Sequence, residues 1–537
     1  MNCTRLLLAF LLVLAVTNAR YNLRYLQLPA RQMRRLFFSN TTLRNFCLEE
    51  GPAPDPDDGV SGCPYHDMAM NPRPWGFEDD CSSKDLTSAK SRIKCKEEKD
   101  VDKFWWQADF GYIRNHASNW VEYCKARGAS SLTCNSHLQF CKATNLAIDF
   151  RKIKDDLLKS TKQYRSDLVK DKGIIEANCK MDWKAFEKQA DRRGFLSSWA
   201  EELLKLTERS EPVFDLDTPR QDCDLVVDKP AFIVKLDAGV NMFHHFCDFI
   251  NIFATQAMLG HLDKNILIVN WHTSVNTYYD PFHMMWQAFT WYQPVQISEW
   301  AQKRVCFRQA YFPLLPRLYF GLYYNMPLVK NCERSSLFKA FHDVMAHRMN
   351  LTQKGPLKGT VRVTLLHRET AHRNIRNGEE LKNAVEKIPG VLYKEVTYSM
   401  KMPFEKQMEI TYNSDVFIGM HGAGLTHCLF LPDWAVLFEL HNCEDADCYM
   451  NLAKMRGVHY MTWEKDELAK RHGDGKHPIS KSEHAKFFDY EFDPAEYGRL
   501  VKKAVAYVRE HPTYQNALRT NKDQDATITE RGGHDEL

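Results

Sequence analysis

Residues 415–440 constrain the fold more than any other part of the chain, because they place two apolar runs on either side of a glycine turn. Residues 416–420 are apolar, β-branched or aromatic and predict a buried strand. Residues 425–431 have helical spacing, and residues 435–440 predict the next strand. The segment therefore predicts strand, turn, helix and strand, the unit from which α/β sheets are built.

The glycine turn itself has the geometry that suits a pyrophosphate. It consists of His421, Gly422, Ala423 and Gly424, and Leu425 begins the helix. A strand end followed by a helix start brings backbone N–H groups and the positive end of a helix dipole to one point. Glycine lets the backbone approach a ligand without a Cβ in the way. The alternative is an ordinary tight turn in an α/β domain that binds nothing.

Strands and helices alternate from about residue 224 onward, which predicts parallel sheets. Strands are expected at 231–236, 266–270, 361–367, 391–396, 416–420 and 458–462, and helices at 242–258, 379–387, 403–412 and 494–510. Two such sets, divided near residues 351–358, predict two Rossmann-like domains that face each other across a cleft. The 537 residues are enough for two or three domains.

The remaining chain divides by composition. Residues 1–19 form an expected signal peptide, and residues 20–220 form an expected cysteine-rich module that packs on the core or shapes an acceptor groove. The two Rossmann-like domains then occupy residues 221–355 and 356–515. Residues 516–537 are polar and charged and are expected to be a flexible tail.

The two ends of the chain indicate the compartment. Arg5 precedes a short apolar run and a small-residue cleavage site, as in a secretory signal; an uncleaved anchor is the alternative. The chain ends in His534, Asp535, Glu536 and Leu537, an ER retrieval signal that a receptor reads. These signals place the protein in the ER lumen. No later segment is apolar for long enough to span a bilayer, and a net charge of +3 gives no preference for nucleic acid.

Cysteine usage agrees with an oxidising lumen. Of the sixteen cysteines, Cys3 leaves with the signal, so an odd number remains and at least one is unpaired within the chain. Cys428 lies on the apolar face of the helix after the glycine turn and is the expected buried free thiol. The pairing of the others stays open. Asn40 and Asn350 begin N-glycosylation sequons.

A polar cluster follows the expected strand at 231–236. Asn241, His244, His245 and Asp248 fall near one face of an otherwise apolar helix. Polar groups at the carboxyl end of a parallel strand line the usual ligand crevice, and a His–Asp pair there could act as a general base. The alternative is a helix cap with a buried, satisfied histidine.

Two further strand ends carry charges. Arg368, Arg373 and Arg376 follow the strand at 361–367, where a guanidinium could bind phosphates, although a basic surface loop is the alternative. Glu439 ends the strand at 435–440, where a carboxylate could hold ribose or sugar hydroxyls; a surface charge is the alternative.

The combined motifs resemble the plant xylosyltransferase-type glycosyltransferase family. The similar segments are NxFHxxxD from residue 241, the arginine-rich strand end with a downstream asparagine, and HGAGLTHxLFLP from residue 421. The segments at 102–112, 138–149, 235–251 and 303–307 and the HDEL end resemble the ER-lumenal branch of that family, which acts on EGF repeats.

This resemblance implies a GT-B-like fold and inverting transfer of GlcNAc from UDP-GlcNAc to Ser or Thr of folded EGF-like domains. It implies clients among secreted and cell-surface proteins, such as Notch-like receptors and matrix proteins. Residues 221–355 would form the acceptor side and residues 356–515 the nucleotide-sugar side. The family motifs match Asn241, His244, Asp248, Arg368, Arg373, Asn377, His421, Gly422, Ala423 and Gly424.

In the expected mechanism, Asp248 or His244 is the general base, and Arg368 with the Gly422–Leu425 amides balances the charge of the departing UDP. The sequence departs from the family where residues 288–290 (Ala-Phe-Thr) are followed by Trp-Tyr-Gln with no carboxylate. No metal ligand is therefore assigned, and a manganese or magnesium ion is optional. The alternatives are a related transferase with another sugar donor or an O-mannosyl acceptor, and a non-catalytic ER glycoprotein binder.

Overall fold

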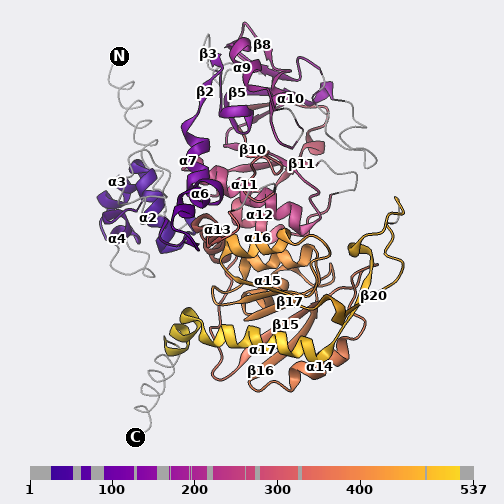
Figure 1. Ribbon diagram of the computed structural model, residues 1–537. Coiled ribbons are helices and arrows are strands. Elements are labelled where there is room, and N and C mark those ends of the chain that lie inside the picture. The colour runs from indigo at the N-terminus through magenta and orange to yellow at the C-terminus, as the bar shows by residue number, and fades with distance from the viewer. Residues whose placement is uncertain are drawn as a thin grey trace.

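The computed structural model describes residues 26–52, 62–73, 90–125, 130–153, 169, 171–192, 194, 196–214, 222–260, 262–272, 278–324, 329–477 and 480–520. The expected signal peptide and the HDEL terminus lie outside these residues. Figure 1 shows two α/β units stacked one above the other, with a small helical group beside them. That group consists of α2 (Ala30–Ser39), α3 (Thr41–Glu50) and α4 (His66–Met70).

The upper unit is built on a ten-stranded mixed sheet, whose main path has the order β12-β11-β10-β13-β5-β4-β2. β12, β11, β10 and β13 run parallel, whereas β5 pairs antiparallel with β13. The strands are β2 (Val121–Glu122), β4 (Ser131–Cys134), β5 (Cys141–Asp149), β6 (Ile175–Ala177), β8 (Thr207–Glu208), β9 (Leu225–Val227), β10 (Ala231–Leu236), β11 (Leu267–His272), β12 (Val295–Gln296) and β13 (Arg304–Phe312).

Helices of the upper unit lie between its sheet and the lower unit (Figure 1). They include α6 (Lys99–Ala108), α7 (Phe110–Ser118), α11 (Met242–Leu259), α12 (His283–Phe289) and α13 (Ser336–Arg348). α11 is buried along nearly its whole length, which explains why its sequence is apolar on most sides. Short elements complete this region: β3 (Cys124–Lys125), β7 (Lys180–Met181), α9 (Trp183–Gln189), α10 (Ala200–Leu203), β1 (Lys94–Cys95) and β14 (Cys332–Glu333).

The lower unit holds an all-parallel sheet of five strands in the order β16-β15-β17-β18-β19. The strands are β15 (Val361–His367), β16 (Val391–Thr397), β17 (Val416–Gly419), β18 (Val436–Glu439) and β19 (His459–Thr462). α14 (Gly378–Glu386) and α17 (Pro494–Glu510) pack together on one face. α15 (Phe404–Tyr412), α16 (Asp447–Arg456) and the 3₁₀ helix η5 (Ala423–Phe430) pack on the other.

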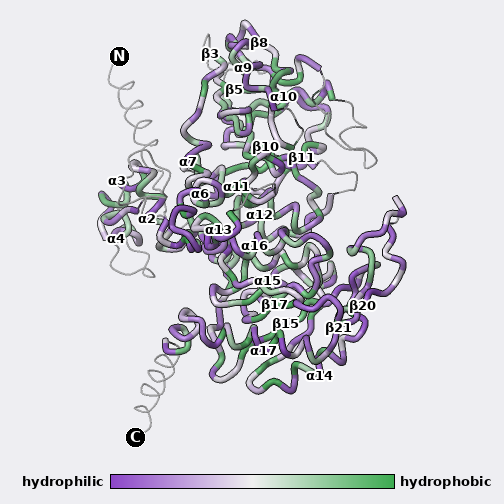
Figure 2. Tube along the Cα trace, viewed as in Figure 1, coloured by the Kyte–Doolittle hydropathy of each residue, from purple (hydrophilic) through white to green (hydrophobic). Residues whose placement is uncertain are grey.

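Side chains of β17 show how the two faces divide the core. Val416 and Ile418 pack into a cluster with α14 and α17, whereas Phe417 belongs to a larger cluster that continues into the upper unit. This alternation follows from the two-residue period of a strand. In Figure 2 the hydrophobic segments concentrate in the sheets, whereas the hairpin of β20 (Ala469–His472) and β21 (Asp489–Phe492) is largely hydrophilic.

Most of the elements expected from residue 231 onward are confirmed. The strands at 231–236 and 361–367 and the helix at 494–510 have the bounds that the sequence predicts. The helix after the glycine turn differs, because it winds as 3₁₀ rather than α over Ala423–Phe430. The boundary expected near residue 220 is not a sheet boundary either: β5 lies before it and β13 after it, yet the two strands are neighbours.

Five disulfides join described cysteines: Cys47–Cys63, Cys95–Cys332, Cys124–Cys179, Cys134–Cys141 and Cys223–Cys306. Cys428 is buried and unpaired, as expected. Among the described residues, no helix is both long and apolar enough to cross a membrane.

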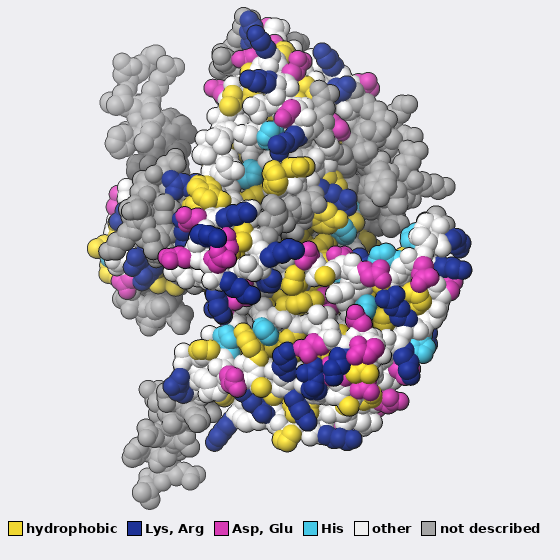
Figure 3. Space-filling model, viewed as in Figure 1, with side chains coloured by type: hydrophobic (Ala, Val, Ile, Leu, Met, Phe, Trp, Pro, Cys, Tyr) yellow, Lys and Arg dark blue, Asp and Glu magenta, His cyan; other side chains and the backbone are white. Residues whose placement is uncertain are grey.

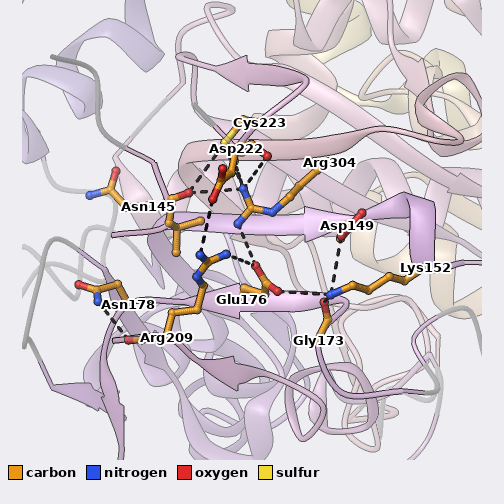
Figure 4. A network of polar contacts seen from close by, with 12 residues as sticks. Asn145, Asp149, Lys152, Gly173, Glu176, Asn178, Arg209, Asp222, Cys223 and Arg304 are labelled. Atoms are coloured by element: carbon orange, nitrogen blue, oxygen red, sulfur yellow. Dashed lines mark hydrogen bonds and ion pairs between the residues drawn. A yellow bond between two sulfur atoms is a disulfide. The ribbon is translucent and has the colours of Figure 1, made fainter. Parts of the chain in front are cut away.

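A buried ionic network fixes the strands that meet beside the Cys223–Cys306 disulfide (Figure 4). Glu176 on β6 accepts hydrogen bonds from Arg304 at 2.8 Å and from Arg209 at 3.0 Å. Burial alone would raise the pKa of Glu176, but these two guanidinium groups outweigh it and lower the pKa. The network therefore joins β6 to Arg304, the first residue of β13.

Asp109 connects the starts of two helices of the upper unit. Its carboxylate accepts hydrogen bonds from the backbone N–H groups of Phe110, Ser336 and Leu337, at the beginnings of α7 and α13. The side chain is fully buried. A carboxylate at a helix N-terminus satisfies N–H groups that have no partner within the helix.

Replacing Asp109 with asparagine is expected to lower the free energy of unfolding by about 1–3 kcal/mol, because the amide NH₂ cannot accept the hydrogen bonds that one carboxylate oxygen accepts now. Chemical denaturation measures the change. The control is Asp102→Asn on α6, where the exposed carboxylate pairs with Lys90. This substitution should change the free energy of unfolding by less than about 0.5 kcal/mol. Equal effects of the two substitutions would contradict the capping role.

Candidate active site

A cavity of about 1110 Å³ opens where the carboxyl ends of the lower strands face the start of α11. Parallel sheets bind ligands at this edge. The upper wall consists of Asn241, Phe243, His244, Tyr323 and Tyr324. The lower wall includes Arg368, Arg373, Tyr398, Met400, Lys401, His421, Gly422, Ala423, Gly424, Asp445, Tyr449 and Lys486. The structure thus brings most of the expected site residues to one cavity.

Two arginines form a cationic patch on the lower wall. The guanidinium groups of Arg368 and Arg373 both approach the carbonyl oxygen of His421, at 3.5 and 2.9 Å. Within the described part of the chain, neither has a carboxylate at ion-pair distance, and the buried Nε of each lacks a hydrogen-bond partner. Burial and the neighbouring Arg373 lower the pKa of Arg368 to about 10, so it stays charged at neutral pH. Such a pair fits an anion with several oxygens, such as a diphosphate.

Gly422 makes this arrangement possible. Its φ of 153° is one that side chains rarely adopt, and a Cβ at this position would collide with the Nη1 atom of Arg368. The turn therefore needs glycine both for its backbone and for the close approach of the guanidinium. Ala423 and Gly424, which begin η5, line the cavity beside it.

His421 is fixed from behind by a buried carboxylate. Its Nδ1 lies 2.8 Å from Glu439 Oε1, and the hydroxyl of Tyr460 donates to Glu439 Oε2 at 2.5 Å. Glu439 is fully buried and does not line the cavity. The expectation that Glu439 holds ribose or sugar hydroxyls is therefore wrong: both of its oxygens are occupied, and it orients His421 instead.

A histidine–carboxylate pair stands on the upper wall. His244 Nδ1 lies 3.0 Å from Asp237 Oδ2, and Arg317 donates two hydrogen bonds to the same carboxylate at 2.7 and 2.9 Å. Burial alone would raise the pKa of Asp237, but the hydrogen bonds from His244 and Arg317 outweigh it, so the pKa is lowered. The ionised Asp237 orients the imidazole and leaves Nε2 as the nitrogen able to accept a proton.

Asp248 does not reach the cavity. It is buried behind Asp237, and its Oδ2 accepts a hydrogen bond from the backbone N–H of Asp237 at 3.1 Å. Burial and the negative charge of Asp237 raise its pKa well above the ordinary value. The expectation that Asp248 acts as a general base is corrected: its buried carboxyl touches no part of the cavity and supports the Asp237 loop instead. Asn241 lines the cavity, and its side chain caps α11 through the N–H of Phe243.

Two other expected site residues have structural positions. Asn377 exchanges hydrogen bonds with the backbone of Phe492 on β21 and does not line the cavity. Leu425 is fully buried in the core beneath η5. Neither side chain faces the cavity, although Leu425 directly follows the cavity residue Gly424 in the sequence.

One group of described residues could hold a metal ion: ligand atoms of His421, Asp445 and Cys448 lie within 4.8 Å of one another. Lys486 already pairs with Asp445 at 2.8 Å, and burial raises the pKa of the Cys448 thiol to about 12. Manganese and magnesium prefer oxygen ligands, so this nitrogen, oxygen and sulfur set does not fit them. We assign no step of the reaction to a metal.

Comparison with known proteins shows the family to which the chain belongs. The model of the family Glycosyltransferase 61 matches residues 242–438. EGF domain-specific O-linked N-acetylglucosamine transferases of Gallus gallus and Mus musculus are 41% and 40% identical, over 91% and 93% of this chain and 91% and 92% of their own lengths. The Drosophila melanogaster protein of the same name is 37% identical over 83% of this chain and 86% of its own.

The chain belongs to this transferase family. It is a glycosyltransferase, and a glycosyltransferase takes its sugar from an activated donor, typically a nucleotide sugar. The matched region begins with α11 and ends at Phe438, so it contains the glycine turn and part of each wall of the cavity, whereas Asp445, Tyr449 and Lys486 lie beyond it.

Sequence reasoning missed several functional neighbours of this transferase site. Asp237 ends the predicted strand at 231–236, and only its position at a carboxyl strand end marked it. Arg317 lies 80 residues from Asp237, and nothing in the local sequence indicates their contact. Lys486 reaches the cavity from the segment before β21, far from any motif.

Proposed function

We propose that this transferase moves a single GlcNAc from UDP-GlcNAc to Ser or Thr hydroxyls of folded EGF-like domains, with inversion at the anomeric carbon. The observation that carries the proposal is one cavity with unpaired guanidinium groups on one wall and an oriented histidine on the other. The relatives' printed name supports the sugar and the acceptor. We also propose a GT-B-like arrangement, supported by the two sheets whose parallel strands end at this cavity.

The proposed reaction is a single displacement. Nε2 of His244 accepts the proton of the acceptor hydroxyl while that oxygen forms a bond to the anomeric carbon from the face opposite the departing UDP. Asp237 stabilises the imidazolium that results. The bond from the anomeric carbon to the diphosphate breaks, and the departing negative charge is met by Arg368, Arg373 and the first amides of η5. Attack from the opposite face turns an α-linked donor sugar into a β-linked product.

The proposal is tested by incubating the purified protein with a folded EGF-like domain and a set of nucleotide sugars. Mass spectrometry is expected to find one N-acetylhexosamine on a Ser or Thr when UDP-GlcNAc is present, and NMR of the product is expected to find a β linkage. Preferred transfer of xylose, or transfer only to an O-mannosyl acceptor, would overturn the assignment of donor or acceptor.

The proposed site of action is the ER lumen. The signal-like N-terminus and the HDEL end support it, together with disulfides that persist only in an oxidising compartment. Asn350 is exposed at the end of α13, where a glycan would meet no obstacle. Glycans on the cellular protein should be removed by an endoglycosidase that acts only on high-mannose chains; resistance would indicate passage beyond the ER.

A further inference from the structure

The loop that follows β13 carries two large aromatic side chains into solvent. Tyr319 and Phe320 are 64% and 53% exposed and form an edge-to-face pair with ring centroids 4.6 Å apart. The side chains on either side of them, Leu318 and Leu322, are fully buried. The loop is thus anchored on both sides of the exposed pair, so its exposure does not follow from a lack of local structure.

The described part of this loop is tied to the upper wall of the cavity. Gly321 permits a tight turn, because a Cβ there would collide with the carbonyl oxygen of Tyr324. At the start of the loop, Arg317 holds the Asp237 carboxylate with two hydrogen bonds. At its end, Tyr323 and Tyr324 line the cavity. The aromatic pair therefore lies on the rim beside the proposed proton acceptor.

The surroundings of the pair have the composition of a protein-binding surface. The guanidinium of Arg192 lies 5.0 Å from the ring centre of Tyr319, so a cation and two aromatic rings stand side by side. Tyrosine and arginine are enriched among the residues that contribute most to binding at protein interfaces. On the face drawn in Figure 3, acidic and basic side chains are mixed.

The site of reaction indicates what covers this surface. A nucleotide sugar fits inside the cavity and needs no platform outside it. A small folded domain, in contrast, can insert only the side chain that is modified, and its remaining surface must rest on the rim next to His244. The loop that carries Tyr319 and Phe320 borders the cavity on that side, because Arg317 before the pair holds Asp237 and Tyr323 and Tyr324 after it line the cavity.

We infer that Tyr319 and Phe320, together with Arg192, form the docking surface for the folded acceptor domain. The fitting partner presents an apolar side chain to the aromatic pair and a carboxylate to Arg192. This inference rests on the proposed function and deepens it: the rim residues select folded domains, whereas the cavity selects the sugar.

The test is the double substitution Tyr319→Ala with Phe320→Ala, assayed with a folded EGF-like domain and UDP-GlcNAc. We expect kcat/KM for the folded domain to fall at least about tenfold, mainly through KM, because the variant lacks two aromatic side chains that the bound domain would bury. The affinity for UDP and the slow hydrolysis of UDP-GlcNAc without acceptor should stay at the wild-type level. Arg192→Glu should raise the same KM, and more so at low ionic strength.

The matched control is Trp291→Ala, which removes an aromatic side chain of similar exposure, 48%, that does not line the cavity. It should leave KM for the folded domain unchanged. If the double variant had the wild-type KM, while the wild-type enzyme was active in a parallel assay, the docking surface alone would be refuted. Absence of transfer by the wild-type enzyme would overturn the proposed function and this inference with it.

Discussion

Replacing Arg368 with alanine is expected to lower kcat/KM by about 10²- to 10³-fold, the effect of removing a donor that stabilises charge in the transition state. Arg368 is partly buried and has no carboxylate partner among the described residues, so its charge is available to a bound diphosphate. Transfer assays at sub-saturating UDP-GlcNAc measure the loss.

A thermal shift experiment separates this role from a structural one. Arg368 and Arg373 repel each other in the free protein, so Arg368→Ala should not lower the melting temperature without ligand. The stabilisation that UDP gives the wild type should disappear in the variant. The control is Arg376→Ala, an arginine of the same loop that pairs with Asp489 and does not line the cavity. Wild-type transfer by the Arg368 variant would refute the phosphate-binding assignment.

Replacing His244 with alanine is expected to lower kcat by about 10²- to 10⁴-fold, the contribution of a positioned general base. UDP affinity should persist, because the guanidinium pair lies on the opposite wall. Calorimetry with UDP and single-turnover transfer to an EGF-like domain measure the two quantities separately. Loss of UDP binding together with turnover would show that His244 holds the donor instead.

Substitutions of Asp237 and Asp248, which lie behind His244, further test whether His244 is the general base. Asp237→Asn removes the negative charge that orients the imidazole and should also reduce kcat strongly. Asp248→Asn should retain most of the activity, since the amide oxygen of asparagine can accept the same hydrogen bond from the Asp237 N–H. If Asp248→Asn were as damaging as Asp237→Asn, the carboxyl of Asp248 would take part in proton transfer after all.

The sequence predicted the sheet of the lower unit and the position of the glycine turn because these depend on local pattern. β15, for example, is a largely buried strand rich in β-branched and apolar residues and is followed by a charged loop, and η5 follows a turn that its glycines predict. The 3₁₀ winding of η5 was not predictable, because helical spacing over eight residues does not distinguish the two helix types.

Side-chain direction accounts for most errors in the candidate site. Glu439, Asp248 and Asn377 were chosen because they stand at strand ends or on motif faces, yet each is turned toward the interior by partners distant in sequence. Tyr460 and Phe492 supply such partners, and no local spacing reveals them. Asp237 and Arg317 were missed for the same reason, since their pairing exists only once the sheet has formed.

The antiparallel pairing of β5 with β13 limits how far the chain of this enzyme can be shortened. Residues far upstream of the Glycosyltransferase 61 match supply the neighbour that covers one edge of β13. Trimming the chain to the matched region would bare that edge to other chains, which favours aggregation. A fragment that is to fold on its own therefore has to include β5 and the other upstream strands that complete this sheet.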